Sequence, residues 1–136
     1  MLDRIITAIV TILVISMLLF GGMFTWVAAV KWWQLAAEAN VLATIMSHYG
    51  EYDTEAEQHL TNFCTNTNID ADDITVTATP GSGETPAAYG QDVSVKLEYN
   101  YDIQLFTFGG HDYVIPFNMP ATGRTISTYT PGLNTG

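Results

Sequence analysis

The first third of the chain contains a long apolar run that passes directly into an amphipathic segment. No charged residue lies between Ile5 and Val30, a run of 26 residues, and a helix needs only about 20 residues to cross a membrane. After this run, apolar residues recur every three or four positions, which is typical of one face of a helix. This stripe consists of Trp32, Leu35, Ala39, Leu42, Met46 and Tyr49. We therefore predict one helix from Asp3 to His48, about 69 Å long.

The residues that follow predict a turn and a second, shorter helix. Gly50 is expected to end the first helix. The sequence Thr54-Glu55-Ala56-Glu57 matches a capping box, with Thr54 as N-cap and Glu57 reaching back to it. The helix should run to about Asn66, with a buried face formed by Ala56, Leu60, Phe63 and Cys64. Cys64 is accordingly interpreted as a small buried residue rather than a reactive thiol.

The rest of the chain alternates between apolar and polar residues, as half-buried strands do. Ile74 to Thr79 predicts a first strand, and Pro80 to Gly90 a loop rich in proline and glycine. Val93 to Leu105 predicts a long antiparallel strand with one wet face, and Gly109-Gly110 a hairpin turn. The returning inner face is Tyr113, Ile115, Phe117 and Met119, in a strand that Pro116 restricts to an edge or a bulge. A last strand is expected from Arg124 to Tyr129, and a tail from Pro131 onward.

These elements predict an α+β fold: a long N-terminal hydrophobic helix, a short second helix and a small antiparallel sheet of about four strands packed on the C-terminal half of the long helix. Residues 1–30 form a transmembrane or filament-core helix, and residues 31–50 an amphipathic stem continuous with it. Residues 51–136 form a small acidic extracellular β domain. A domain of this size has a thin core and is expected to lean on the stem or on neighbouring subunits.

Charge and cysteine content narrow the class of protein. The net charge is −10, and of the 14 acidic residues only Asp3 and Glu38 precede Glu51. Such a domain is not suited to bind nucleic acid or an anionic membrane. Arg4, before the apolar run, favours a cytoplasmic N-terminus and an external C-terminal domain. Because Cys64 is the single cysteine, no internal disulfide is possible.

The chain resembles the type IV pilin superfamily, and more closely its Tad-type and TadE-like bacterial members. The similarity is architectural: the Ile5–Val30 segment, the Lys31–Tyr49 stem, including Ala39-Asn40-Val41-Leu42-Ala43, and then a small β domain. It implies a protein held in the membrane, extracted by a pilus assembly machinery and packed with copies of itself through its N-terminal helix. Members usually have a leader ending in glycine that a prepilin peptidase removes, so we expect either that Met1 is already the mature first residue or that this chain is not a processed pilin. A glutamate is common at the fifth mature position; here Ile5 stands there.

Within the first helix, several residues are candidates for subunit assembly or for the membrane interface. The assembly candidates are Asp3, Arg4, Leu13, Phe20, Gly21, Gly22, Phe24 and Trp26, and the interface candidates are Lys31, Trp32 and Trp33. Asp3 could pair with a terminal amine or with Arg4 of an adjacent subunit, or could simply lie among lipid headgroups. Gly21-Gly22 could allow close helix packing, mark a bend, or be tolerated inside a membrane. Tryptophans are favoured at the membrane interface.

Other chemistry receives little support from the sequence. Glu55 and His59 are four residues apart on the second helix, but a third metal ligand is not evident. The segment Asn66 to Asp72 begins like a calcium loop, yet Ala71 and Thr77 stand where such a loop needs glycine and glutamate. No catalytic or haem motif is present, so we expect no enzyme activity and no cofactor. Cleavage of a signal peptide near Ala29, O-linked sugar between Thr122 and Thr135, and electron conduction through the aromatic residues are weaker interpretations.

Three functions remain as hypotheses. The first is a structural, pilin-like subunit of an extracellular filament. The second is a minor membrane-anchored accessory of a pilus or secretion machine. The third is a bitopic surface protein that binds calcium or another ligand through its acidic domain.

Overall fold

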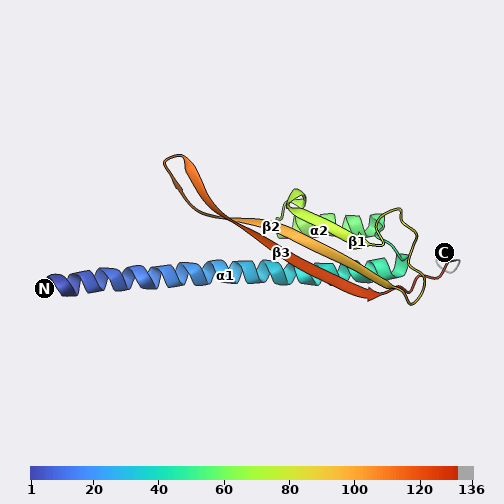
Figure 1. Cartoon of the computed structure of the whole chain (residues 1–136), viewed down its shortest axis with the longest axis horizontal. Helices are drawn as coiled ribbons and strands as arrows, with labels where there is room; N and C mark the ends of the chain where they lie inside the picture. The colour runs from blue at the N-terminus through green and yellow to red at the C-terminus, as the bar shows by residue number, and fades with distance from the viewer. Residues whose placement is uncertain (132–136) are drawn as a thin grey trace. The chain divides into compact units, whose positions relative to one another are not determined.

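The computed structural model describes residues 1–131 and, among these, every side chain except that of Leu105. Two helices, a short 3-10 helix and three strands follow in the order α1, α2, η1, β1, β2, β3 (Figure 1). The chain divides into two compact units, Met1–Trp33 and Gln34–Gly136, each described here by itself. The α+β fold class predicted from the sequence is confirmed.

Helix α1 runs from Leu2 to Tyr49 without a break, one residue longer at each end than the sequence predicted. It ends at Gly50, whose φ is +76° and whose N–H donates to the Met46 carbonyl at 2.7 Å. Glycine adopts this left-handed conformation without steric cost. A Cβ at this position would also lie 2.9 Å from the Ala87 carbonyl oxygen. The predicted role of Gly50 is therefore confirmed, and the reason includes close packing as well as backbone conformation.

Helix α2 spans Thr54–Thr67, but its N-cap differs from the prediction. Asp53, not Thr54, is the N-cap: its backbone is extended and its carboxylate accepts from the Thr54 N–H at 2.7 Å. The predicted capping box, with Thr54 as N-cap and Glu57 as its partner, is therefore wrong. Aspartate is as good an N-cap as threonine or better, and Asp53 lies one residue earlier. Asn68, with φ 55°, ends the helix.

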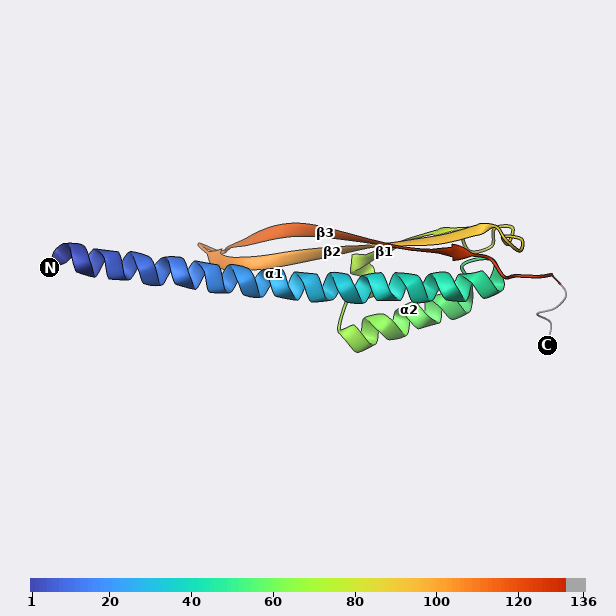
Figure 2. The ribbon, with the colours of Figure 1, turned by 90° about the horizontal axis from the view of Figure 1, so that it is seen from below.

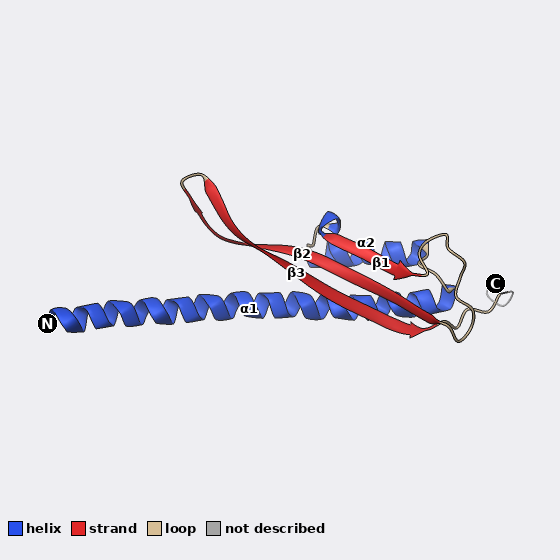
Figure 3. Ribbon diagram, in the orientation of Figure 1, coloured by secondary structure: helices blue, strands red, loops and turns tan. Residues whose placement is uncertain are grey.

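The sheet has three antiparallel strands among the described residues, β1 (Ile74–Thr79), β2 (Asp92–Phe108) and β3 (His111–Ile126), preceded by η1 (Ala71–Asp73) (Figure 3). The two segments predicted as a return strand and a last strand are one continuous strand, β3, since its pairing with β2 runs through Pro120 to Ile126. β3 is an edge strand, as Pro116 predicted. Gly109 and Gly110 both have positive φ and form the predicted hairpin turn.

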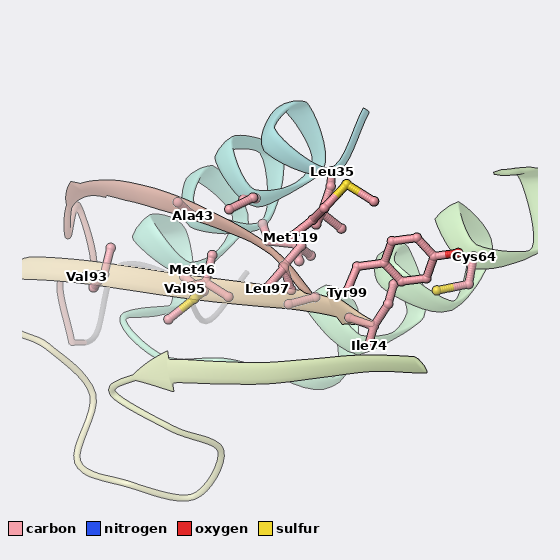
Figure 4. Packing of buried hydrophobic residues seen from close by; sticks show 14 of the residues in the cluster. Leu35, Ala43, Met46, Cys64, Ile74, Val93, Val95, Leu97, Tyr99 and Met119 are labelled. Atoms are coloured by element: carbon pink, nitrogen blue, oxygen red, sulfur yellow. The ribbon is translucent and has the colours of Figure 1, made fainter. Parts of the chain in front are cut away.

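In the second unit, the helices cover one side of the sheet (Figure 2). Leu35, Leu42 and Met46 of α1 are at most 1% exposed and belong to one apolar cluster with the inner face of the sheet. Figure 4 shows Tyr99 lying close to Cys64 of α2 and Ile74 of β1. The sheet contributes Ile74 of β1 and, from β2 and β3, Val93, Val95, Leu97, Tyr99, Met119 and Ala121 to this cluster. The predicted packing of the sheet's apolar face against the stem is confirmed. The predicted stripe is buried only between Leu35 and Met46, because its ends, Trp32 and Tyr49, are 49% and 38% exposed.

At its closest point, the sheet meets the backbone of α1. A Cβ on Gly123 would lie 2.0 Å from the Ala39 carbonyl oxygen and 2.4 Å from its carbon. Gly123 pairs with Val95, the fourth pair from the Asp92–Ile126 end of the β2–β3 ladder. Only glycine allows strand and helix backbones to approach in this way. The absence of a side chain at Gly123 therefore fixes the depth at which the sheet rests on the stem.

The β2–β3 pair continues as a two-stranded ribbon beyond Ile74, the first residue of β1 (Figures 1 and 3). β1 pairs with β2 only from Ser94 to Tyr99. Farther along, the ladder is interrupted between Gln104 and Phe106, where β2 has one residue more than β3. This bulge reverses the alternation of β2, so that Phe106 lies opposite Tyr113 and on the same face.

Candidate membrane-spanning and assembly helix

The first unit is a helix that is apolar on every side. An 18-residue window within α1 has a mean hydropathy of 2.5, and α1 is long and apolar enough to cross a membrane by length and composition. Ile9, Ile12 and Met17 lie in different directions around the helix and are 60%, 65% and 68% exposed. A helix without a polar face is suited to lipid or to a bundle of similar helices rather than to water.

The few hydroxyl groups in this apolar segment are all hydrogen-bonded to the helix itself. Thr7, Thr11, Ser16 and Thr25 each donate to the carbonyl four residues earlier, at 2.7–2.8 Å. A hydroxyl in hydrocarbon costs free energy unless it has a partner. Because each of these hydroxyls uses a backbone carbonyl of its own helix, the segment can lie in lipid or in a dry protein core without an unsatisfied hydroxyl donor.

The predicted assembly residues all lie on this helix. Leu13, Phe20 and Trp26 are 58%, 64% and 72% exposed. The other positions in the set are Asp3, Arg4, Gly21, Gly22 and Phe24. Their involvement in assembly stays a prediction, and their exposure leaves them available for it.

The paired glycines do not interrupt the helix in this chain. α1 is continuous through Gly21 and Gly22, and a Cβ on either would meet nothing within 4 Å. Neither the backbone conformation nor packing within the first unit therefore requires glycine there. Close approach of another helix, or a bend formed in a different environment, remains the open explanation.

At the end of the first unit, Lys31, Trp32 and Trp33 form the predicted membrane-interface group. Trp32 and Trp33 are 49% and 74% exposed. Large amphipathic rings with a cation beside them are typical of the boundary between hydrocarbon and water. Immediately after them, at Leu35, α1 becomes part of the core of the second unit. The same helix thus passes from an all-apolar segment to a segment with a single buried stripe.

Sequence reasoning missed an ion pair between α1 and α2. The carboxylate of Glu38 is 6% exposed and lies 2.7 Å from His59 Nδ1. Burial raises the pKa of Glu38, and the hydrogen bond and charge of His59 act in the opposite direction. The stripe predicted from the sequence contains only apolar residues and leaves out Glu38. The spacing of Glu38, three from Leu35 and four from Leu42, was a signal that it lies on the buried face.

The candidate metal ligands are engaged in other contacts. His59 bonds to Glu38 rather than joining Glu55, and the Tyr49 hydroxyl donates to Glu55. In the segment from Asn66 to Asp72, Asn68 caps α2 and Asp70 caps η1 by accepting from the Asp72 N–H. Across residues 1–131, no group of three or more His, Cys, Asp and Glu side chains has the geometry of a metal site.

Cys64 is buried, as predicted, at 4% exposure. Burial raises the pKa of its thiol, and the charges of Glu38 and Asp70 add to that rise. A thiol in this environment is protonated at neutral pH and reacts slowly. Its contact with the core makes its reactivity a measure of whether the core is open.

The chain was compared with models of known protein families, with curated proteins and with solved structures. No family model, no curated protein and no solved structure matches it.

Proposed function

We propose that this chain is a structural, pilin-like subunit of an extracellular filament. In this proposal the apolar segment of α1 holds the chain in a membrane before assembly, with the N-terminus inside, and then packs into the filament core. Its partners are the membrane, a pilus assembly machinery and copies of itself. The supporting observation is that a helix apolar on every side runs without a break into a stem that forms the core of a folded domain.

The membrane stage follows from the composition of the helix. Residues 5–30 include sixteen Ile, Leu, Val, Met and Phe residues and no charged residue. Each of the Leu, Ile, Phe and Val residues contributes roughly −0.3 to −0.6 kcal/mol to insertion at the centre of a membrane. The hydroxyl groups of the segment are already satisfied by its own backbone. The segment therefore has a strong tendency to enter lipid and no polar group that opposes it.

The filament stage follows from the lack of a buried stripe in this same segment. An ordinary membrane anchor needs only lipid around it. Here the apolar segment is continuous with a stem that forms part of the folded second unit, so movement of the helix into a filament would move that unit with it. If helices of several copies pack together, each exchanges lipid contacts for van der Waals contacts with its own kind. Contacts between different surfaces of successive copies do not close into a ring and produce a helical filament.

The acidic second unit is suited to the surface of such a filament. Twelve of the 14 acidic residues lie from Glu51 onward, and the outer face of the sheet carries the Arg124–Asp92 and Lys96–Glu98 pairs at 3.1 and 2.7 Å. A strongly charged face keeps a protein soluble and resists non-specific contact. This distribution supports a domain that stays in water while the helix leaves it.

The test compares assembly of the full-length wild type with that of Leu13→Lys. After removal of detergent, electron microscopy should show filaments a few nanometres wide for the wild type. Leu13→Lys should still enter membranes, because the remaining apolar residues outweigh a cost of about 3 kcal/mol for one lysine. It should assemble about 100-fold less, since that lysine would be buried among apolar helices.

Thr75→Lys is the matched control, because Thr75 is exposed on the outer face of the sheet opposite Glu98. This variant should assemble as the wild type does. A wild-type chain that stays monomeric in micelles and after detergent removal would refute the proposal. Equal loss of assembly in the two lysine variants would show that the helix is not the core of the filament.

A further inference from the structure

The ribbon beyond β1 has an apolar face that none of the described residues of the second unit covers. We call it the distal apolar face. Starting from the buried pair Tyr99 and Met119, the ladder places Tyr101 opposite Phe117 and Ile103 opposite Ile115. The bulge then brings Phe106 to the same face, where its ring stacks on that of Tyr113 with centroids 4.7 Å apart. The distal apolar face consists of Ile103, Phe106, Phe108, Tyr113, Ile115 and Phe117; it begins next to Tyr101, which packs against the core, and has His111 opposite Phe108 at its tip.

This face is too exposed and too apolar for an isolated ribbon in water. Phe108 is 74% exposed, Phe106 is 55% exposed, and Tyr113, Ile115 and Phe117 are each 48% exposed. With about 200 Å² for each large side chain, these five residues expose roughly 500 Å² of mostly apolar surface. Patches of this size commonly mark an interaction surface. A two-stranded hairpin alone is also only marginally stable, so a partner would stabilise the ribbon.

The opposite face of the ribbon has the contrary character. Thr107 donates to Asp112 at 2.6 Å and accepts from Gln104 at 3.2 Å. Asp102 lies on this face as well, opposite Pro116. The distal apolar face contains no Asp, Glu, Lys or Arg. The ribbon is therefore two-sided, and the bulge restores Phe106 to the apolar side. This arrangement favours a partner on one side only.

The kind of partner is indicated by the first half of the same two strands. From Val93 to Tyr99 of β2 and from Met119 to Gly123 of β3, this face is covered by apolar side chains of the helices: the stripe of α1 and, near Tyr99, Cys64 of α2. The distal apolar face is the direct continuation of that interface and needs a similar cover, an apolar helix. The chain offers such a helix in residues 5–30 of α1, which have no charge and no unsatisfied hydroxyl donor.

We propose that the distal apolar face of one copy packs on residues 5–30 of α1 of a second copy. This inference rests on the proposed function and names a contact that would hold successive subunits together. The contact joins two different surfaces, so each copy can offer its helix to one neighbour and its ribbon to another, and the series does not close. An anionic lipid surface fits less well, because Asp102 and Asp112, on the other side of the same thin ribbon, would be repelled by it.

Photo-crosslinking identifies the occupant directly. Tyr113 is replaced by benzoylphenylalanine in ¹⁵N-labelled full-length chain, which is co-assembled with unlabelled wild type, irradiated and digested. Mass spectrometry should find the probe peptide joined mainly to an unlabelled peptide from residues 5–30. A link confined to the labelled chain itself, a link to another segment of the unlabelled chain, or attachment to lipid alone would overturn the inference.

A matched pair of substitutions tests the face independently. Ile115 and Val114 are neighbours on β3 with similar exposure, 48% and 41%, but Val114 lies opposite Gln104 on the other side of the ribbon. Ile115→Lys should lower the amount of sedimentable filament at least about tenfold, since its charge would be buried in the contact. Val114→Lys should change it less than about twofold. Similar losses for both variants would contradict the inference.

Two controls keep the outcomes apart. Cys64 should stay unreactive toward maleimide in both lysine variants, which shows that the core of the second unit is intact. If Cys64 becomes reactive in Ile115→Lys, the core of that variant is open, and the crosslinking experiment alone decides whether the proposed contact exists. If wild-type filaments form but the crosslink is absent from residues 5–30 of another copy, only this inference fails. If the wild type forms no filament, the proposed function fails, and the inference fails with it.

Discussion

Replacing Gly123 by alanine tests how closely the sheet rests on the stem. The new Cβ would lie 2.0 Å from the Ala39 carbonyl oxygen, 2.4 Å from the Ala39 carbonyl carbon and 2.9 Å from the Asn40 nitrogen. These are backbone atoms of an α-helix and cannot rotate away. Because a Cβ contact below 3.0 Å is essentially never seen, β3 and α1 must separate by about 1 Å.

The magnitude follows from the contacts that this separation weakens. Each pair of atoms in contact attracts by about 0.1–0.2 kcal/mol, and a gap of about 0.5–1 Å removes a quarter to a half of that attraction. If roughly fifty pairs between the sheet and Leu35, Leu42 and Met46 are affected, the loss is about 1–5 kcal/mol and is centred near about 3 kcal/mol, which overlaps the range of about 1–3 kcal/mol typical of overpacked cores. Loss of glycine's freedom in the unfolded chain offsets about 0.4–1 kcal/mol. We therefore expect a net destabilisation of about 2 kcal/mol.

The reactivity of Cys64 provides the assay. The thiol is 4% exposed and is the single cysteine of the chain, so maleimide labelling of full-length protein in micelles reports the population of open molecules. A loss of about 2 kcal/mol should accelerate labelling about 30-fold and lower the Tm by roughly 8–16 °C. Gly81→Ala is the matched control, because its Cβ would meet nothing closer than 3.5 Å.

Two results would refute this reasoning. The first is Gly123→Ala labelling at the wild-type rate, which would mean that the helix and strand separate at almost no cost. The second is rescue by Ala39→Gly in the double variant. Trimming the Ala39 side chain leaves its carbonyl in place, so a steric clash with the backbone cannot be relieved in this way.

Two further substitutions probe polar contacts of the second unit. Glu38→Gln removes a buried carboxyl whose pKa is raised by burial above its ordinary value of 4.5. The wild type should exceed the variant in unfolding free energy by the largest amount below pH 4.5. This difference should fall as the pH rises through the raised pKa of Glu38. A pH-independent difference in thermal melts would contradict this, and His59→Gln should steepen the fall, because His59 lowers the Glu38 pKa. Ser127→Ala removes a fully buried hydroxyl that donates to the Ala87 carbonyl at 2.8 Å and accepts from the Tyr129 N–H at 3.2 Å. It should cost about 1–3 kcal/mol in denaturant unfolding, whereas Thr122→Ala, at an exposed position of β3, should cost less than about 0.5 kcal/mol.

Features that depend on local periodicity could be predicted from the sequence. The stem stripe from Leu35 to Met46 and the alternation from Val93 to Tyr99 are properties of single elements, and each implies an apolar face that must be covered. Gly50 and Gly109-Gly110 are likewise local, because positive φ selects glycine. The fold class followed from these signals alone. The two errors, the N-cap of α2 and the division of β3 into two strands, concern the ends of elements. At such positions aspartate, proline and threonine are compatible with more than one boundary.

Contacts between distant elements could not be predicted in the same way. Gly123 is one of 11 glycines, and nothing near it in the chain shows that it meets the backbone of Ala39. The pairing of Glu38 with His59 joins residues 21 positions apart. The helical spacing of Glu38 from Leu35 and Leu42 indicates the buried face, but the general rule that carboxylates face water indicates the opposite. A buried carboxylate is stable only with a partner, and that partner becomes known only when α2 is placed beside α1.

The bulge in β2 shows why the distal apolar face required the structure. The residues around it, Ile103, Leu105, Phe106 and Phe108, are all apolar, and strict alternation assigns Phe106 and Phe108 to the wet face. One extra residue between Gln104 and Phe106 reverses that assignment, because side chains alternate with a period of two. A run that is apolar at consecutive positions does not indicate where such a residue is inserted. The result is a ribbon with its aromatic residues on one side, and a continuous apolar surface of this kind on an edge hairpin needs a cover if the second unit is to remain soluble.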